Sequence, residues 1–212
     1  EIGVVVVVSV LLCGMLMKSF RDSYKEKIEE QVESAAYMVA NQIRADVVNQ
    51  VEATGGFDGE AYRRLCEIME NSFTMDIPFY RQLYCNILKL SEDGEEGYAV
   101  AYLDQSIGAY FPLDETELEE VKEIYKTKKS VWNDEVADIS GTYLSIKVPV
   151  FNRTGEVAGV VAVGVETYVL DNTLFELQKR VFMSIVIVVL LIWLVSTEVM
   201  SFASNMNLYK KN

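Results

Sequence analysis

One lysine in the chain occupies a position where its charge needs an explanation. The segment Thr142–Val150 alternates in polarity, which is typical of a β-strand with two unlike faces. One face carries Tyr143, Ser145 and Lys147, and the other carries Leu144, Ile146 and Val148. A lysine in the middle of such a strand needs either solvent or a negative partner. A ligand carboxylate could be that partner, and a solvated outer face is the alternative.

Other side chains nearby in the sequence have the chemistry of a small-molecule site. Such sites are mostly apolar with a few placed polar groups. Arg81 could anchor an anion, although a surface ion pair is the simpler explanation. Trp132 could be an aromatic wall or ordinary core, and Asp134 could supply an acceptor. The candidate ligand-binding residues are Arg81, Tyr102, Tyr110, Trp132, Asp134, Tyr143, Ser145 and Lys147.

Catalytic chemistry is poorly represented. The chain has no histidine, which excludes Ser-His-Asp and Cys-His catalysis and His-ligated zinc from these residues. Asp134, Glu135 and Asp138 lack the spacing of an EF-hand, and no glycine-rich phosphate loop is present. We therefore expect no enzymatic activity, no metal site and no cofactor.

Charge and cysteine content narrow the partners further. The formal net charge is −13, and residues 21–180 hold 16 of the 19 basic and 30 of the 32 acidic side chains. A nucleic-acid-binding surface needs the opposite charge, so we expect no nucleic-acid partner. Cys66 and Cys85 could form a disulfide in an oxidising compartment, or both could be buried thiols.

Two uncharged apolar runs, Ile2–Met17 and Val181–Thr197, bracket this acidic middle. A helix crosses a bilayer with about 20 apolar residues, and the second run reaches that length if it continues to Ala203. The first is shorter, and because the chain opens on Glu1 we expect it to begin inside or just before a span. A buried core helix is the alternative for each run. A cleaved signal peptide is a second alternative for the first run, but the charged exit at Lys18 favours a retained anchor.

These runs predict a two-pass plasma-membrane protein with an extracytoplasmic domain. The basic pair Lys210–Lys211 favours a cytoplasmic C-terminus by the positive-inside rule. The expected organisation is a first span over residues 1–18, a folded domain over 19–180, a second span over 181–203, and the start of a cytoplasmic segment over 204–212.

Periodicity predicts the elements of the domain. Apolar residues spaced by three and four indicate one long helix from Ser19 to about Ala53, and a second helix runs to about Phe73. A helix over Asp114–Lys129 begins with a capping box of Asp114 and Glu117. Strands are expected at Phe79–Leu90, Tyr98–Leu103, Val131–Asp138, Thr142–Phe151 and Val157–Tyr168. The predicted fold class is α+β, with one five-stranded antiparallel sheet and a long N-terminal helix.

This order resembles the single Cache domain, an extracytoplasmic PAS-like sensor of bacterial chemoreceptors, sensor kinases and cyclases. The long helix, the final hairpin LSIKVPVFNRTGEVAGVVAVGVE and the short link Thr167–Lys179 carry the resemblance. It implies a ligand between one sheet face and the connection Asp104–Asp138. An aspartate that often grips an amino-acid ammonium in the family is replaced here by Gly164, with Glu166 two residues on, which argues against an amino-acid ligand.

The resemblance implies extracytoplasmic sensing of a small organic ligand, a carboxylate being one candidate, and signalling through the membrane to an output module outside this sequence. It also implies a homodimer assembled through the long N-terminal helix. Two alternatives stay open: an extracytoplasmic module that binds a protein or cell-wall partner, and a regulatory domain of a membrane transporter.

Overall fold

The structure, a computed structural model, describes residues 2–51, 59–73, 82–103, 111–138 and 141–209. Its contacts group the chain into two units. One unit comprises Ser19–Val169, and the other comprises Glu1–Lys18 together with Leu170–Asn212. The first unit contains the sheet and the candidate binding residues, and it is described first.

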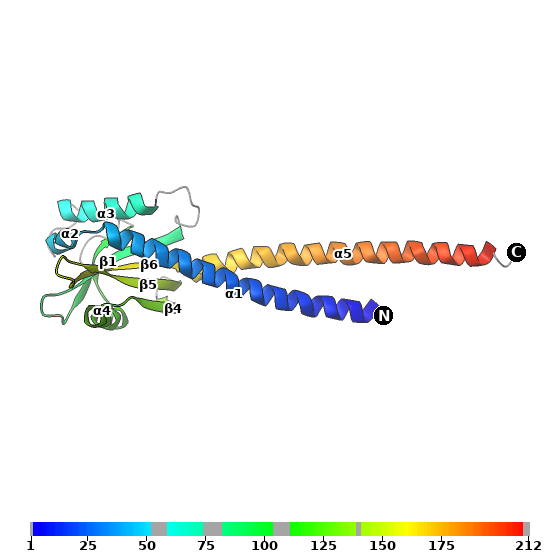
Figure 1. Cartoon of the computed structure of the whole chain (residues 1–212), viewed down its shortest axis with the longest axis horizontal. Coiled ribbons are helices and arrows are strands. Elements are labelled where there is room, and N and C mark those ends of the chain that lie inside the picture. The colour runs from blue at the N-terminus through cyan, green and yellow to red at the C-terminus, as the bar shows by residue number, and fades with distance from the viewer. Residues whose placement is uncertain (1, 52–58, 74–81, 104–110, 139–140, 210–212) are drawn as a thin grey trace. The chain divides into compact units, whose positions relative to one another are not determined.

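The sheet has the five predicted strands and one short addition, and all its neighbouring pairs are antiparallel (Figure 1). Its order is β3-β2-β1-β6-β5-β4, so the last strand lies in the interior between β1 and β5. The strands are β1 Leu83–Leu90, β2 Gly97–Tyr102, β3 Phe111–Pro112, β4 Val131–Asp138, β5 Gly141–Phe151 and β6 Val157–Glu166. The predicted five-stranded antiparallel sheet is therefore confirmed, and β3 extends one edge by two residues.

The long N-terminal helix ends earlier than the sequence predicts. Helix α1 spans Ile2–Gln42 and a separate helix α2 spans Ala45–Gln50, whereas one helix was expected to run to about Ala53. The break falls at Arg44, whose backbone is extended. No proline or glycine marks it, and the buried Val47 and Val48 beyond it suit tertiary packing better than a straight continuation. Gly159 on β6 lets Val48 approach, because a Cβ there would lie 3.0 Å from the valine.

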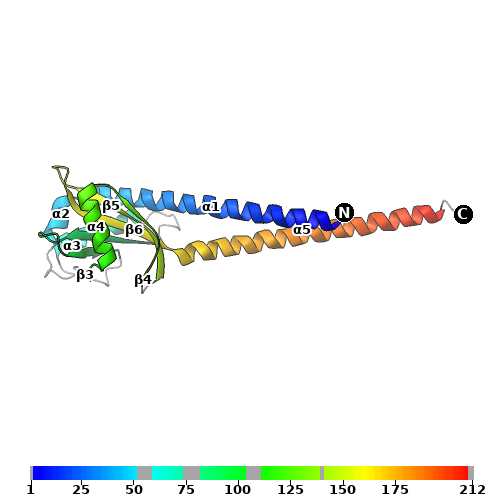
Figure 2. The same cartoon turned by 90° about the horizontal axis from the view of Figure 1, so that it is seen from below.

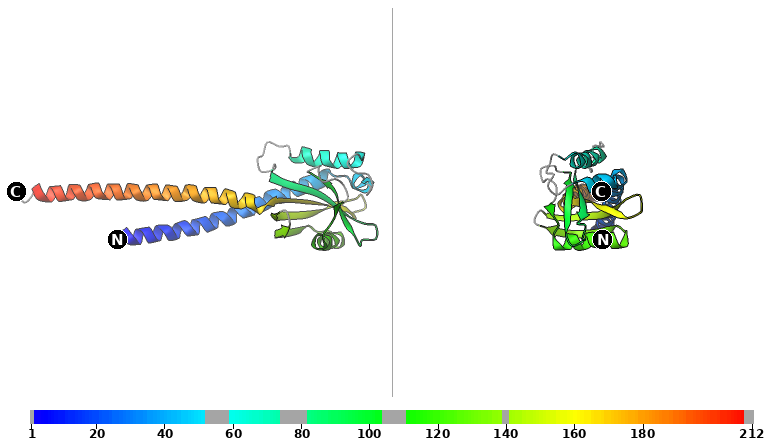
Figure 3. Two further views of the ribbon diagram at one scale, coloured as in Figure 1. Left: turned by 180° about the vertical axis from the view of Figure 1, so that it is seen from behind. Right: turned by 90° about the vertical axis from the view of Figure 1, so that its left-hand side faces the viewer.

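Helices cover both faces of the sheet within this unit. In the end-on view of Figure 3 the sheet separates α3, Glu60–Phe73, from α4, Glu115–Thr127. Helices α1 and α2 lie on the same side as α3, and Figure 2 shows α4 crossing in front of the strands from the other side. We call the two faces the α1 side and the α4 side. Strand residues of the α1 side include Cys85, Ile87, Ile146, Val148, Val161 and Val163; those of the α4 side include Asn86, Leu88, Ser145, Lys147, Val160 and Ala162.

Helix α4 is fixed at both ends by its own sequence. Asp114 is the N-cap, and its side chain accepts a hydrogen bond from the Glu117 backbone N–H, as predicted for this position. Lys128 ends the helix in the left-handed conformation, with φ of 59°. Between these ends Val121 and Ile124 are fully buried against Leu88 and its neighbours on the sheet. The helix is thus held in a defined register over the α4 side.

The second unit contains most of helix α5, which spans Thr167–Tyr209. It begins at the residue that follows β6, so the interior strand of the sheet passes into the helix without a loop. Among the described residues, one helical segment is long and apolar enough to cross a membrane, Leu174–Val199, with a mean hydropathy of 2.4. The first predicted span, Ile2–Met17, forms the beginning of helix α1.

Candidate functional site

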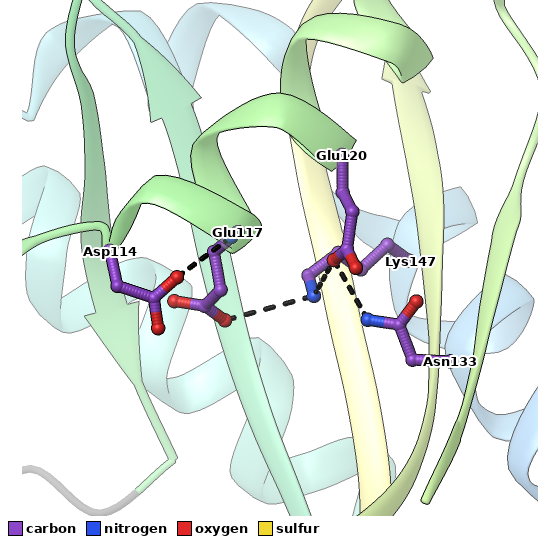
Figure 4. Close-up of polar contacts among 5 residues, drawn as sticks. All are labelled: Asp114, Glu117, Glu120, Asn133 and Lys147. Carbon is purple, nitrogen blue, oxygen red and sulfur yellow. Dashed lines mark hydrogen bonds and ion pairs between the residues drawn. The ribbon is translucent and has the colours of Figure 1, made fainter. Parts of the chain in front are cut away.

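Lys147 lies at the centre of a buried polar network on the α4 side. Its side chain is only 5% exposed, so the solvated position considered from the sequence is wrong. Its ammonium donates a hydrogen bond to Glu120 Oε2 at 2.6 Å, and the Glu117 carboxylate lies 3.7 Å away (Figure 4). Asn133 Nδ2 donates to the same Glu120 oxygen at 2.7 Å. The negative partner that the lysine requires is therefore supplied by the chain itself.

Three elements bring this network together. Lys147 comes from β5 and Asn133 from the adjacent edge strand β4, while the two glutamates come from α4. Glu117 and Glu120 are three residues apart, so they share one face of that helix. The N-cap at Asp114 fixes the first turn, which carries Glu117. The glutamates are thereby presented to the lysine by backbone geometry rather than by long flexible loops.

The network is expected to add little net stability. Desolvation of two charges offsets much of their attraction, so a buried ion pair adds little net stability, whereas removing one partner is costly. Glu120 has 17% of its side chain exposed and Lys147 has 5%.

A row of side chains crosses the sheet from this network to β2. Register pairs Lys147 with Ala162, Ala162 with Asn86, and Asn86 with Tyr102. Burial and, after it, the negative charge of Glu117 raise the pKa of Tyr102 to about 12. The electrostatic influence of Glu117 therefore reaches Tyr102.

The neighbouring row is dominated by tyrosine rings. Gly164 pairs with Tyr84 on one side and with Ser145 on the other. A Cβ at Gly164 would lie 2.5 Å from the Tyr84 ring, so the ring fills the space that a side chain would need. Tyr143 meets this ring edge-on, with centroids 5.1 Å apart. Gly164, which was interpreted from the sequence as replacing an aspartate, thus leaves space for the Tyr84 ring.

The structure places four of the eight predicted ligand-binding residues on one face of the sheet. Tyr102, Tyr143, Ser145 and Lys147 all belong to the α4 side. Sequence reasoning missed Tyr84, Asn86, Glu117, Glu120 and Asn133. Two signals could have indicated them. The alternation of β1 places Tyr84 and Asn86 on one face, and the three-residue spacing of the glutamates matches one face of a helix.

The other four predicted residues lie elsewhere or outside the described residues. Trp132 pairs with Ile146, which puts it on the α1 side, opposite to Lys147. It lines an open hollow of about 350 Å³ with Leu144 and four carboxylates of α1, which are Glu26, Glu29, Glu30 and Glu33. Asp134 lies in β4 where its pairing with β5 is irregular. Arg81 and Tyr110 are outside the described residues.

The cysteines of the domain are free thiols. Cys66 and Cys85 are both buried, and burial raises the pKa of each thiol above its usual value. Cys66 Sγ lies 3.7 Å from the Tyr102 carbonyl oxygen, to which it donates. Within the described residues, His, Cys, Asp and Glu side chains form no group of three able to hold a metal ion.

Comparison with known proteins finds similarity only among solved structures. No family model matches the chain, and no curated protein matches it. The ligand-binding domain of the Campylobacter jejuni chemoreceptor Tlp3, in complex with 4-methylisoleucine, is 14% identical, with a TM-score of 0.47 over 74% of this chain and 58% of that one. The periplasmic sensory domain of C. jejuni Tlp1 is 13% identical, with a TM-score of 0.46, covering 73% and 59% of the two chains.

An extracellular ligand-binding receptor from Desulfohalobium retbaense is 14% identical, with a TM-score of 0.49, and the match covers 75% of this chain and 26% of that one. The chain thus spans less than two thirds of the length of each of these three proteins. The first two are described as ligand-binding or sensory domains, and the third is described as a receptor.

Proposed function

We propose that this chain is the sensory part of a membrane receptor, in which a small organic ligand binds on the α4 side of the sheet. The connection between β6 and α5 carries this proposal. Strand β6 contributes Ala162 and Gly164 to the α4 side, and helix α5 begins at the next residue after its end. A ligand that changes the position of β6 would act on α5 directly.

The α4 side has the mixed composition expected of a ligand site. Tyrosine rings from three strands provide apolar contact, and Ser145, Asn86 and the Lys147 network provide polar groups. A ligand can signal only if it binds one of two states better than the other. Helix α4 is the element that covers this side, so its position over the sheet is the natural difference between those states.

Membrane insertion and assembly belong to the same proposal. We propose that α5 crosses the membrane at Leu174–Val199, that the start of α1 forms a second span, and that the output module lies beyond this sequence. The apolar stripe of α1, including Ile28, Val32 and Val39, is buried within its own unit. A homodimer through α1 would therefore use another side of this helix.

Ligand binding to the α4 side can be tested by a thermal-shift screen of the chain in detergent against organic amines, carboxylates and amino acids, because a ligand stabilises the state it binds. Tyr102→Ala should abolish the shift produced by a hit. Trp132→Ala, a matched loss of an aromatic ring on the opposite side, should leave it unchanged. A shift that depends on Trp132 and not on Tyr102 would move the site to the α1 side.

Signal transfer can be tested by disulfide cross-linking between copies of the chain that carry single cysteines along Lys18–Ile28. Ligand should change the rates at some of these positions if α1 and α5 respond to the sheet. Rates that stay the same at saturating ligand would contradict transmission through these helices.

A second function, recognition of a protein or cell-wall partner, is favoured by one observation. Val121 and Ile124 of α4 pack directly on Leu88, Ala99 and Val160, so the described part of the helix lies close against the sheet. A module without a small-molecule site would have this packing, and it would give no hit in the thermal-shift screen.

A further inference from the structure

We infer that Glu120 is a specificity-determining residue. By occupying the ammonium of Lys147, it makes the α4 side discriminate against a carboxylate ligand in favour of the equivalent ammonium compound. This inference rests on the proposed function, since it names the ligand chemistry of the same site. It also reverses the expectation drawn from Lys147 in the sequence, where a ligand carboxylate was the candidate partner.

The position where an anion would bind Lys147 is already occupied by a carboxylate of the chain. Glu120 Oε2 lies 2.6 Å from the ammonium and accepts a further hydrogen bond from Asn133. Because Glu120 is attached to the same domain, its effective concentration at the lysine is far higher than that of a free ligand. A ligand carboxylate would have to displace it and break the Asn133 bond as well.

The charges around Lys147 also disfavour an anionic ligand. Two carboxylates, from Glu117 and Glu120, approach one ammonium within 4 Å. The three groups together carry one negative charge. Burial and, after it, the negative charge of Glu117 raise the pKa of Tyr102 to about 12, so the charge of Glu117 is also felt at this tyrosine. Bringing another anion close to these carboxylates is unfavourable, since like charges repel.

The tyrosine rings on the α4 side also affect which sign of ligand charge is favoured. Tyr84, Tyr102 and Tyr143 belong to the α4 side, and the Tyr84 ring fills the space beside Gly164. An organic cation is attracted to the face of an aromatic ring, whereas an anion is not. The rings and the carboxylates therefore favour the same sign of ligand charge.

The test compares three probes of equal chain length, n-butylammonium, butyrate and 1-butanol. Binding to the chain in phosphatidylcholine nanodiscs is measured by isothermal titration calorimetry, with saturation-transfer NMR for weak binding. The alcohol reports the apolar contribution alone. We expect butylammonium to bind at least about tenfold more tightly than butyrate, a ratio that corresponds to ~1.4 kcal/mol.

Glu120→Gln is the decisive variant, because it removes one carboxylate while keeping the shape of the side chain. It should narrow or invert the preference by strengthening butyrate binding and weakening butylammonium binding. Glu119→Gln, which removes the same charge from an exposed position one residue away, should leave the preference unchanged. A merely structural role of Glu120 would weaken both probes together.

The possible results distinguish failure of this inference from failure of the proposed function. Equal or tighter binding of butyrate to the unaltered chain overturns the inference and leaves a ligand site in place. A preference that Glu120→Gln does not alter also overturns it. Failure of all three probes to bind counts against the proposed function, and the inference falls with it. If Glu120→Gln does not fold, the comparison of probes on the unaltered chain still decides.

Discussion

The two sides of the sheet are built from the same strands yet differ in chemistry. On the α1 side, β5 and β6 contribute Ile146, Val148, Val161 and Val163, all 1% exposed or less. On the α4 side the alternate positions of the same strands contribute Ser145, Lys147, Ala162 and Gly164. A strand turns successive side chains to opposite faces, so one set of residues can serve two purposes.

This difference indicates which side of the sheet stabilises the fold and which side responds to ligand. Close-packed aliphatic side chains give most of their free energy through burial, and they do not tolerate rearrangement. A buried ion pair beside small residues and tyrosine rings contributes less net stability. We therefore expect the α1 side to hold the fold and the α4 side to respond to ligand.

The largest effect is expected from a truncation on the α1 side. Ile146→Ala should lower the free energy of unfolding by about 3 kcal/mol, because the residue is fully buried and its loss leaves a cavity. Urea unfolding followed by Trp132 fluorescence measures this, in a Trp193→Phe background that leaves one tryptophan. Phe151→Ala, at a position 48% exposed, should cost far less. Equal losses would mean that the α1 side is not the main source of stability.

The ion pair should give the next largest effect. Lys147→Met should cost about 3 kcal/mol, the lower end of the range for breaking a buried pair, because it leaves Glu120, itself 17% exposed, without its cationic partner. The double variant Glu120→Leu with Lys147→Met should recover much of that loss, since it removes both charges. The same unfolding assay compares the two. If the double variant is the less stable of the pair, the network contributes stability rather than specificity.

Crowding at Gly164 gives a third comparison. Gly164→Ala should cost about 1–3 kcal/mol, because the added methyl group meets the Tyr84 ring. In a Tyr84→Ala background the same substitution should cost much less, and the double-mutant cycle measures the difference. A cost that is independent of Tyr84 would show that backbone freedom, and not the ring, requires glycine.

The smallest effect is expected at the N-cap of α4. Asp114→Ala should cost about 1 kcal/mol, because the Glu117 N–H loses its acceptor. Asp114→Asn keeps an acceptor and should cost only a fraction of that. Thermal unfolding resolves the two variants. Equal costs would point to the charge of Asp114 near the helix N-terminus instead of the cap hydrogen bond.

Local pattern predicted much of the fold. Alternation and turn residues located the five long strands, and the capping signal at Asp114 located α4 to within a few residues. The break at Arg44 was not predictable in this way, since no helix-breaking residue marks it and the packing of Val47 and Val48 decides it. Elements defined by short-range sequence patterns could be predicted, whereas a bend that depends on tertiary contacts could not.

The site was predictable only in part for a similar reason. Lys147 drew attention because a charge in an alternating strand needs a partner. That partner, Glu120, lies 27 residues away, and nothing local links the two. Trp132 was grouped with Lys147 by type, but the pairing of β4 with β5 turns it to the opposite side. Register between strands is a property of the folded sheet, so the sequence of one strand does not reveal it.

Hydrogen–deuterium exchange of the chain in nanodiscs, with and without saturating butylammonium, tests the central claim most directly. The claim is that ligand binds on the α4 side and acts on α5 through β6. We predict that exchange changes in α4, Glu115–Thr127, and at the junction Val163–Val169, while α2 and the buried part of α1 stay the same. Changes confined to α1 and α2, with α4 and the junction unaffected, would contradict it.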